Sequence, residues 1–286
     1  MSGPGRGTTL GVGERRAGKI ALGLLAWVVG LVWIFPVAWT LFTSFKTEQD
    51  AAAQTLTQGL SLERYREVSS STEGTLSLAT AFANSVFVVA LSTAIVMLLA
   101  IPAAYALAIR PIPKWRDVLF FVISTKFLPV VASIFPIYVY AEKWNLIGTR
   151  TILVVLYTAI NLPLAIWMLR SFFMEVPREL IEAAEIDGTT LINQLRSVIL
   201  PIAAPGIAAT ALLCVIFAWN EYFYAIQLNF AGGSTMPQWV IGNVDTRGNF
   251  LAKLSAASVI ACLPVVLAGW LAQKRMIRGL SMGAIK

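Results

Sequence analysis

Several side chains that can carry charge or form hydrogen bonds lie inside long apolar stretches of this sequence. They are Lys126, Asn161, Asn220 and Glu221. A charged group at the centre of a bilayer costs about 3 kcal/mol on insertion scales, so such residues usually face a polar cavity or a partner. Three aromatic residues accompany the last pair, Trp219, Tyr222 and Tyr224. Aromatic rings beside paired donors and acceptors suit the recognition of hydroxyl-rich solutes.

The same polar side chains could instead hold helices together, for instance through an ion pair between Lys126 and Glu221. A position near the membrane interface is a further explanation. Both interpretations stay open for Asn220 and Glu221, whereas helix packing is favoured for Asn161. The candidate pathway residues are therefore Lys126, Trp219, Asn220, Glu221 and Tyr222.

The sequence offers few residues for catalytic or metal chemistry. The chain has no histidine, which excludes a Ser-His-Asp set and imidazole metal sites. Cys214 and Cys262 lie in apolar runs, where small core residues are the simpler interpretation. Residues 13–20, GERRAGKI, nearly match a phosphate-binding P-loop, but Ile20 replaces the magnesium-binding Ser or Thr and no strand precedes the match. We expect no catalytic residues, no metal site and no cofactor bound by this chain.

Membrane helices must position these residues. Of the 286 residues, 57% are hydrophobic and 13% are charged, whereas about a quarter of an ordinary soluble domain is charged. Lys and Arg lie beside the apolar runs along the whole chain, so the net charge of +7 indicates membrane orientation and no nucleic-acid partner. The expected fold class is all-α, a polytopic helical bundle in a lipid bilayer.

Six apolar runs are long enough to cross a membrane. They cover residues 20–42, 81–109, 118–140, 151–173, 206–228 and 251–272. Connections expected in the cytoplasm hold 14 Lys and Arg, those expected outside hold 7, and Lys126 completes the total of 22. This bias places both termini in the cytoplasm.

The expected organisation has three parts. A basic, disordered cytoplasmic tail covers residues 1–19, a six-span transmembrane domain covers 20–273, and a cytoplasmic C-terminal tail covers 274–286. The outer connection 43–78 is polar and is expected to be partly helical around 62–68. It could contact an external partner, although a plain solvated connection explains it equally well.

A polar segment over residues 175–201 separates the fourth and fifth spans. Pro177 suits the first position of a helix, Glu179 suits the positive end of its dipole, and Gly188 suits a left-handed stop.

A second helix should follow this stop over residues 191–199. Thr189 or Thr190 can cap it, and it should end near Pro201. Two helices joined by a tight glycine turn predict a compact knob on the inner face.

The segment resembles the EAA loop of ABC importer permeases. The matching residues are Glu182, Ala183, Ala184, Asp187, Gly188, Val198, Leu200 and Pro201. The family usually has Ile in place of Val198, a difference of one methylene. The resemblance implies a coupling helix that docks into a cleft of an ATPase subunit. A plain amphipathic linker is the alternative, but the spacing and the place between the fourth and fifth spans favour coupling.

The end of the chain, RGLSMGAIK, resembles the C-terminal tail of the maltose-type second permease, which reaches between the ATPase subunits. The contact residues that this implies are Gly279, Leu280, Gly283 and Ala284. With residues 218–221, AWNE, the resemblance runs from about Leu76 onward. Residues 114–126, KWRDVLFFVISTK, and the ending GLSMGAIK are most similar to permeases for polyols such as sorbitol and mannitol.

The resemblance implies a type I ABC importer permease in a bacterial inner or plasma membrane that moves a carbohydrate or polyol. The implied partners are a second permease in a heterodimer, two ATPase subunits that use ATP and Mg, and an external substrate-binding protein. In maltose-type relatives the partner permease mainly holds the substrate, so the candidate pathway residues could be gate or packing residues. The alternative is a stand-alone secondary transporter or channel, which should show internal repeats and broken helices; neither is clear in this sequence.

Overall fold

The computed structural model describes residues 11–54, 60–70, 77–110, 112–229, 233–244 and 250–283, with the backbone alone for 11–18 and 274–283. Helices and the turns between them make up these ranges, and no strand occurs within them. The predicted all-α class is confirmed.

Four uninterrupted helices are long and apolar enough to cross a membrane. They are α1 (Gly11–Thr43), α4 (Leu78–Ala108), α7 (Arg150–Met174) and α14 (Leu251–Gly283). Two bent pairs of helices also pass that test, so the count reaches six when each pair is one span.

The third predicted span, residues 118–140, is wrong as a single helix. It consists of α5 (Trp115–Ser124) and η1 (Thr125–Phe127), followed by α6 (Val130–Lys143) at an angle of 91°. Leu128 adopts an extended conformation with ψ 124° directly before Pro129. The proline ring disfavours the helical region for the preceding residue, and this explains the break. Broken helices are therefore present, although the sequence showed none clearly.

The fifth predicted span, residues 206–228, also differs. The helix α11 (Ala204–Trp219) ends before the polar residues 220–222, and a separate short helix, α12 (Phe223–Leu228), follows. At its other end α11 meets the helical segment Leu191–Ile202 at 81°. Hydrogen bonds from polar side chains to nearby backbone groups compete with the helix ladder and favour such an interruption.

Both ends of the chain are more helical than expected. The prediction of a disordered tail through Lys19 is wrong for residues 11–19, because α1 already begins at Gly11. Adding a residue to an existing helix is cheap, and Glu, Arg, Ala and Lys are good helix formers. At the other end α14 continues to Gly283, so the last span and most of residues 274–286 form one helix.

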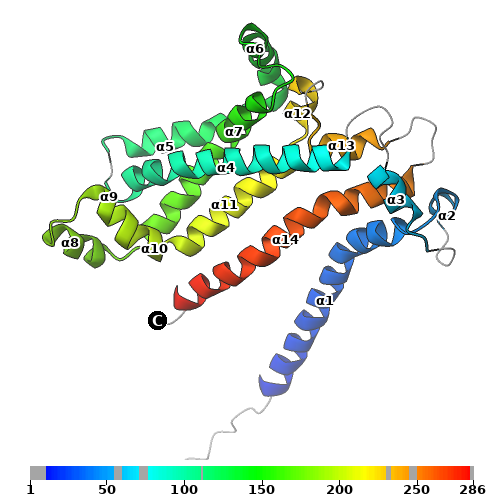
Figure 1. Ribbon diagram of the computed structural model, residues 1–286. Coiled ribbons are helices and arrows are strands. Elements are labelled where there is room, and N and C mark those ends of the chain that lie inside the picture. The colour runs from blue at the N-terminus through cyan, green and yellow to red at the C-terminus, as the bar shows by residue number, and fades with distance from the viewer. Residues whose placement is uncertain are drawn as a thin grey trace, which may run out of the picture.

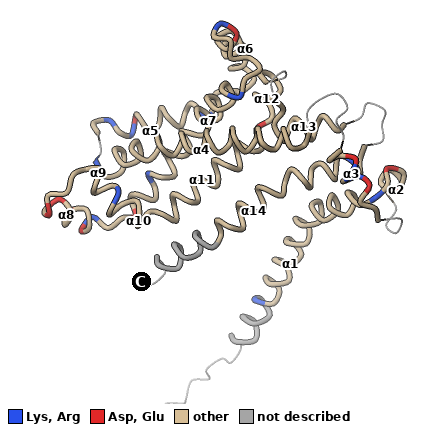
Figure 2. The backbone as a smooth tube through the Cα atoms, in the orientation of Figure 1, with Lys and Arg blue, Asp and Glu red and all other residues tan. Residues whose placement is uncertain are grey.

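The helices run between two polar ends of the molecule (Figure 1). One, the knob end, holds α8 (Arg178–Ile186), α9 (Leu191–Gln194) and α10 (Leu200–Ile202). The opposite end holds α2 (Glu48–Ala52), α3 (Glu63–Ser70) and α13 (Met236–Gly242). Figure 2 shows that most charged residues gather at these ends and that the long helices between them are mainly uncharged. This distribution suits a bundle that crosses a bilayer.

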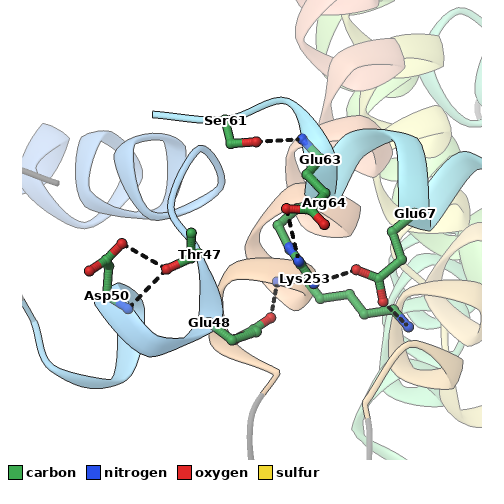
Figure 3. Close-up of polar contacts among 8 residues, drawn as sticks. All are labelled: Thr47, Glu48, Asp50, Ser61, Glu63, Arg64, Glu67 and Lys253. Atoms are coloured by element: carbon green, nitrogen blue, oxygen red, sulfur yellow. Dashed lines mark hydrogen bonds and ion pairs between the residues drawn. The ribbon is translucent and has the colours of Figure 1, made fainter. Parts of the chain in front are cut away.

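The opposite end is fastened by charged contacts (Figure 3). The carboxylate of Glu48 accepts hydrogen bonds from the backbone N–H groups of Ala252, at 3.1 Å, and Lys253, at 2.7 Å, at the start of α14. The ammonium group of Lys253 lies 3.2 Å from Glu67 of α3, which also pairs with Arg64. A carboxylate at a helix N-terminus satisfies free N–H groups and the helix dipole, so these contacts hold α2 and α3 against α14.

Two clusters of buried side chains form the core. One lies toward the opposite end and includes Leu153, Tyr157 and Trp219. The other lies at the root of the knob, where the knob joins the long helices, and includes Leu169, Phe173 and Ile199. The helices α4 and α7 contribute to both clusters and so extend along the centre of the bundle.

Candidate functional site

The first helix of the knob, α8, presents one face to the bundle. Pro177 immediately precedes α8 as its N-cap, so its predicted place as the first helical residue is wrong by one position. Glu179 lies in the first turn, as expected. Ile181 and Ala184 are buried, while Glu182 and Ala183 are exposed. The helical period of α8 therefore buries Ile181 and Ala184 and leaves Glu182 and Ala183 free to contact another molecule.

The turn after α8 is built around Gly188. Its φ of +72° lies in the left-handed region, which confirms the predicted glycine stop. The backbone N–H and the hydroxyl of Thr189 both donate to the carbonyl of Ala184, at 3.1 and 2.6 Å. These bonds satisfy a carbonyl that the end of α8 leaves free.

Thr190 begins the second helix of the knob. Its hydroxyl accepts a hydrogen bond from the N–H of Asn193 at 3.4 Å, so Thr190, rather than Thr189, is the cap. The helix then changes to a π-helix, η2 (Leu195–Ile199), and continues as α10 to Ile202. The predicted end near Pro201 is confirmed, because the helical segment stops at Ile202. The π-turn lets Pro201 occupy the first turn of α10, where its missing N–H costs little.

Large apolar side chains remain exposed on this polar end. Ile186 is 86% exposed and Ile192 is 76% exposed, and Leu191 is also exposed. We name the exposed residues Glu182, Ala183, Ile186, Leu191 and Ile192 the knob surface. Exposed apolar groups on a protruding element are typical of surfaces that contact another protein.

The structure adds two residues that the sequence did not single out, Tyr105 of α4 and Gln194 of α9. Both are buried, and their side chains share a hydrogen bond of 2.6 Å. The sequence feature that could have indicated this contact is the polar Gln194 among the apolar residues of 191–199. Near them, Arg110 pairs with Glu185 of α8 at 2.5 Å in an exposed position.

The candidate pathway residues lie at two helix breaks, one between η1 and α6 and one between α11 and α12. Lys126 is exposed within η1, just before the Leu128–Pro129 break. It forms no ion pair with Glu221 in the part of the chain that the structure describes. Trp219 is the last residue of α11, and residues 220–222 form the break between α11 and α12.

Residues 219–222 have different surroundings. The indole N–H of buried Trp219 donates to the carbonyl of Ala261 in α14 at 3.0 Å. Asn220 is exposed and donates to Ile216 of its own helix at 2.8 Å. Tyr222 is half-buried. Glu221 accepts the N–H of Tyr224 at 3.0 Å through Oε1, while its buried Oε2 has no hydrogen-bond partner. Glu221 therefore caps α12 and keeps one acceptor free.

The two breaks are held near each other. The hydroxyls of Ser133, in the first turn of α6, and Tyr224 of α12 lie 3.0 Å apart. From α7, Tyr157 donates to the carbonyl of Glu221 at 3.1 Å. Asn161, one turn further along α7, is buried and donates to the carbonyl of Tyr157. Polar groups at paired helix breaks resemble the way in which many transporters build solute sites.

The predicted C-terminal contact residues lie in the last helix or beyond it. Gly279, Leu280 and Gly283 belong to the helical backbone of α14, and Ala284 lies outside the described residues. Cys214 is buried, Cys262 is exposed, and both are free thiols. Within the ranges that the structure covers, no three Cys, Asp or Glu side chains group as metal ligands would.

Comparisons with known proteins agree with this architecture. The family model for the binding-protein-dependent transport system inner membrane component matches residues 98–278. The chain is 32% identical over 286 residues to the sulfoquinovosyl glycerol transport system permease protein SmoH of Agrobacterium fabrum, and 98% of each chain is covered. It is 31% identical over 271 residues to the trehalose/maltose transport system permease protein MalG of Thermococcus litoralis, covering 94% of this chain and 97% of that protein.

A solved structure is similar as well. It is the crystal structure of a bacterial ABC transporter involved in the import of the acidic polysaccharide alginate, one chain of which matches with a TM-score of 0.70. The match covers 96% of this chain and 99% of that chain at 22% sequence identity. At this identity the similarity concerns the fold.

Proposed function

Because the chain belongs to the family of binding-protein-dependent transport system inner membrane components, we propose that it is a permease subunit of an ATP-binding-cassette importer for a carbohydrate. The transmembrane domain over 20–273 crosses the membrane several times. Residues 1–19 and 274–286 are its cytoplasmic ends, so the knob end faces the cytoplasm. This sidedness agrees with the excess of Lys and Arg in the connections of that end.

The knob is the observation that carries the proposal. It is a rigid pair of helices with a fixed glycine turn, buried roots and the exposed knob surface. In this proposal the knob surface docks on an ATPase subunit, and Glu182, Ala183, Ala184, Asp187, Gly188, Leu200 and Pro201 shape the contact. Glu182 and Ala183 touch the partner directly, whereas Ala184 is buried and sets the position of the helix.

The proposal includes a defined assembly. A second permease pairs with this chain as a heterodimer, two ATPase subunits bind ATP and Mg, and an external binding protein delivers the solute. The chain itself is no enzyme and binds no cofactor. Residues Gly279, Leu280, Gly283 and Ala284 extend toward the ATPase pair. ATP-driven closure of that pair moves the knobs as rigid levers and switches the solute path between inward-facing and outward-facing states.

The solute in this proposal is a sugar or a polyol. The names of the relatives include sulfoquinovosyl glycerol and trehalose/maltose transport systems, and the sequence resembles polyol permeases over 114–126. The paired helix breaks supply the path, with Lys126, Asn220, Tyr222 and the free oxygen of Glu221 as its polar groups. Trp219 holds the end of α11 beside this path through its hydrogen bond to Ala261 of α14. Thermal protection of the intact complex by a panel of sugars and polyols would identify the solute.

A charge reversal on the knob surface tests the proposal. We expect Glu182→Lys to lower uptake at least tenfold, and to lower the amount of ATPase that co-purifies, while membrane insertion stays normal. Glu142→Lys is the matched control, because Glu142 is exposed on α6, away from the knob. Normal uptake and a normal amount of bound ATPase in Glu182→Lys would contradict the coupling role.

A stand-alone secondary transporter or channel is the second candidate. The broken span at Leu128–Pro129 is one of the features expected of that class. Purification of the chain from native membranes separates the two. A co-purifying ATPase supports the importer, whereas full transport activity without any ATPase would support the alternative.

A further inference from the structure

The knob is joined to the bundle by a buried hydrogen-bonded contact. Gln194 is 1% exposed and sits at the end of α9. Its amide N–H donates to the carbonyl of Ile181 in α8 at 3.1 Å, and its Oε1 accepts the hydroxyl of Tyr105 in α4 at 2.6 Å. One side chain therefore links both helices of the knob to a transmembrane helix.

This contact is well suited to transmit motion. Tyr105 is 8% exposed, and both it and Ile181 belong to the apolar cluster at the root of the knob. A buried network in which both ends of the amide are satisfied is rigid, because any displacement would leave a polar group without a partner. The exposed pair of Arg110, just after α4, and Glu185 of α8 is a weaker link, since solvent screens it.

The connection along the chain has a different character. Between Gln194 and α11 lie the π-helix η2 and an 81° bend near Ala203. A π-helix and a sharp bend are sites of local adjustment, so α11 does not continue the knob as a straight rod. The buried contact makes α4 a more direct mechanical neighbour of the knob than α11.

The other end of α4 holds an element at the opposite end of the molecule. The backbone N–H of Met236, the first residue of α13, donates to the hydroxyl of buried Ser85 at 2.7 Å. Asn84 donates to the carbonyl of Ser234 at 3.2 Å. The stretch of α4 from Ser85 to Tyr105 spans about 30 Å at 1.5 Å per residue, roughly the thickness of the hydrocarbon layer. Figure 1 shows α4 extending from α9 to α13.

We propose that Tyr105 and Gln194 are positioning residues that transmit displacement of the knob through α4 to α13. The inference rests on the proposed coupling function of the knob. In this mechanism ATP-driven movement of α8 and α9 pulls α4 through the Tyr105 contact. The Ser85 contact then moves α13, where the chain faces the external side. The route crosses the membrane within one helix and continues through hydrogen-bonded contacts at both ends.

A reporter on α13 tests this route in the complete complex. Ile241 is 48% exposed, so Ile241→Cys, with Cys214 and Cys262 replaced by Ala, gives this chain a single thiol for maleimide labelling. Labelling is measured with and without MgATP plus vanadate, together with the ATP hydrolysis rate. We expect MgATP plus vanadate to change the labelling rate at least twofold when Tyr105 and Gln194 are intact.

Tyr105→Phe removes only the hydroxyl, and Gln194→Met removes both bonds of the amide. With either change we expect at least half of the nucleotide-dependent labelling change to be lost, while ATPase subunits stay bound and hydrolyse ATP. Tyr65→Phe is the matched control. Tyr65 lies in α3 at the opposite end, and its hydroxyl bonds that of Ser44, just after α1, at 2.7 Å. It should retain the full labelling change.

Three outcomes would overturn the inference. The first is a full labelling change in Tyr105→Phe and Gln194→Met. The second is no nucleotide-dependent change when both residues are intact. The third is that the variants assemble less complex, but the complex that does assemble shows the full labelling change. The contact between Tyr105 and Gln194 would then serve folding alone. If instead Glu182→Lys retains the ATPase and uptake, the proposed function itself has failed, and the two failures are thereby distinguished.

Discussion

Phe172 of α7 occupies the space in which a side chain on Gly206 of α11 would lie. A Cβ atom at position 206 would fall 2.2 Å from Cγ of the Phe172 ring. Because Cγ is the root of the ring, rotation of the ring cannot relieve this overlap. The absence of a side chain at Gly206 is thus what allows α7 and α11 to approach closely near the knob.

This relationship predicts that Gly206→Ala lowers the free energy of unfolding by about 1–3 kcal/mol, the usual range for overpacking. Thermal unfolding of the purified complex measures the effect. In a Phe172→Ala background the same substitution should cost much less, because the ring is gone. Gly269→Ala is the control, since its Cβ would meet no atom within 4 Å. Equal destabilisation by Gly206→Ala in both backgrounds would argue against the contact.

The turn at Gly188 gives a second prediction, based on backbone conformation. No atom lies within 4 Å of a Cβ built at this position, so size is not the constraint, but φ is +72°. We expect Gly188→Val to abolish uptake with normal membrane insertion, because β-branched residues strongly disfavour the left-handed region. Gly188→Asn should retain most uptake, because Asn tolerates that region. Similar uptake in the two variants would show that the turn conformation is unimportant.

The contact between Glu48 and the start of α14 gives a third prediction. Glu48→Ala removes both hydrogen bonds to the N–H groups of Ala252 and Lys253. It should lower the free energy of unfolding by about 1–3 kcal/mol, the typical cost for a bond to a charged group. Glu48→Gln keeps one acceptor oxygen and should cost less. Thermal unfolding in detergent provides the measurement, and an unchanged midpoint in Glu48→Ala would show that the contact adds no stability.

Glu221 allows capping and pathway roles to be separated. In Glu221→Gln one oxygen can still accept the N–H of Tyr224, so we expect only a small decrease in thermal stability. Uptake of the solute identified by thermal protection should nevertheless fall at least tenfold, because an N–H donor replaces the free acceptor oxygen beside the path. Glu221→Ala should lower both stability and uptake. Full uptake by a stable Glu221→Gln protein would leave Glu221 as a capping residue alone.

The sequence determined the features that depend on nearby residues. The apolar runs predicted the membrane bundle, because hydropathy acts through composition over about 20 residues. The glycine stop at Gly188 and a threonine cap were predicted, since φ preferences and caps operate within one turn. The break at Leu128 was missed, although its signal was local and lay in Pro129.

Only the tertiary structure decided which distant residues meet. Tyr105 and Gln194 are 89 residues apart, and Glu48 lies 204 residues before the Ala252 that it caps. The two helix breaks also meet only because α6, α7 and α12 pack together. Periodicity says which face of a helix is apolar but not which helix covers it. The fit of Gly206 to Phe172, and the connection of the knob to α4, follow from packing in three dimensions.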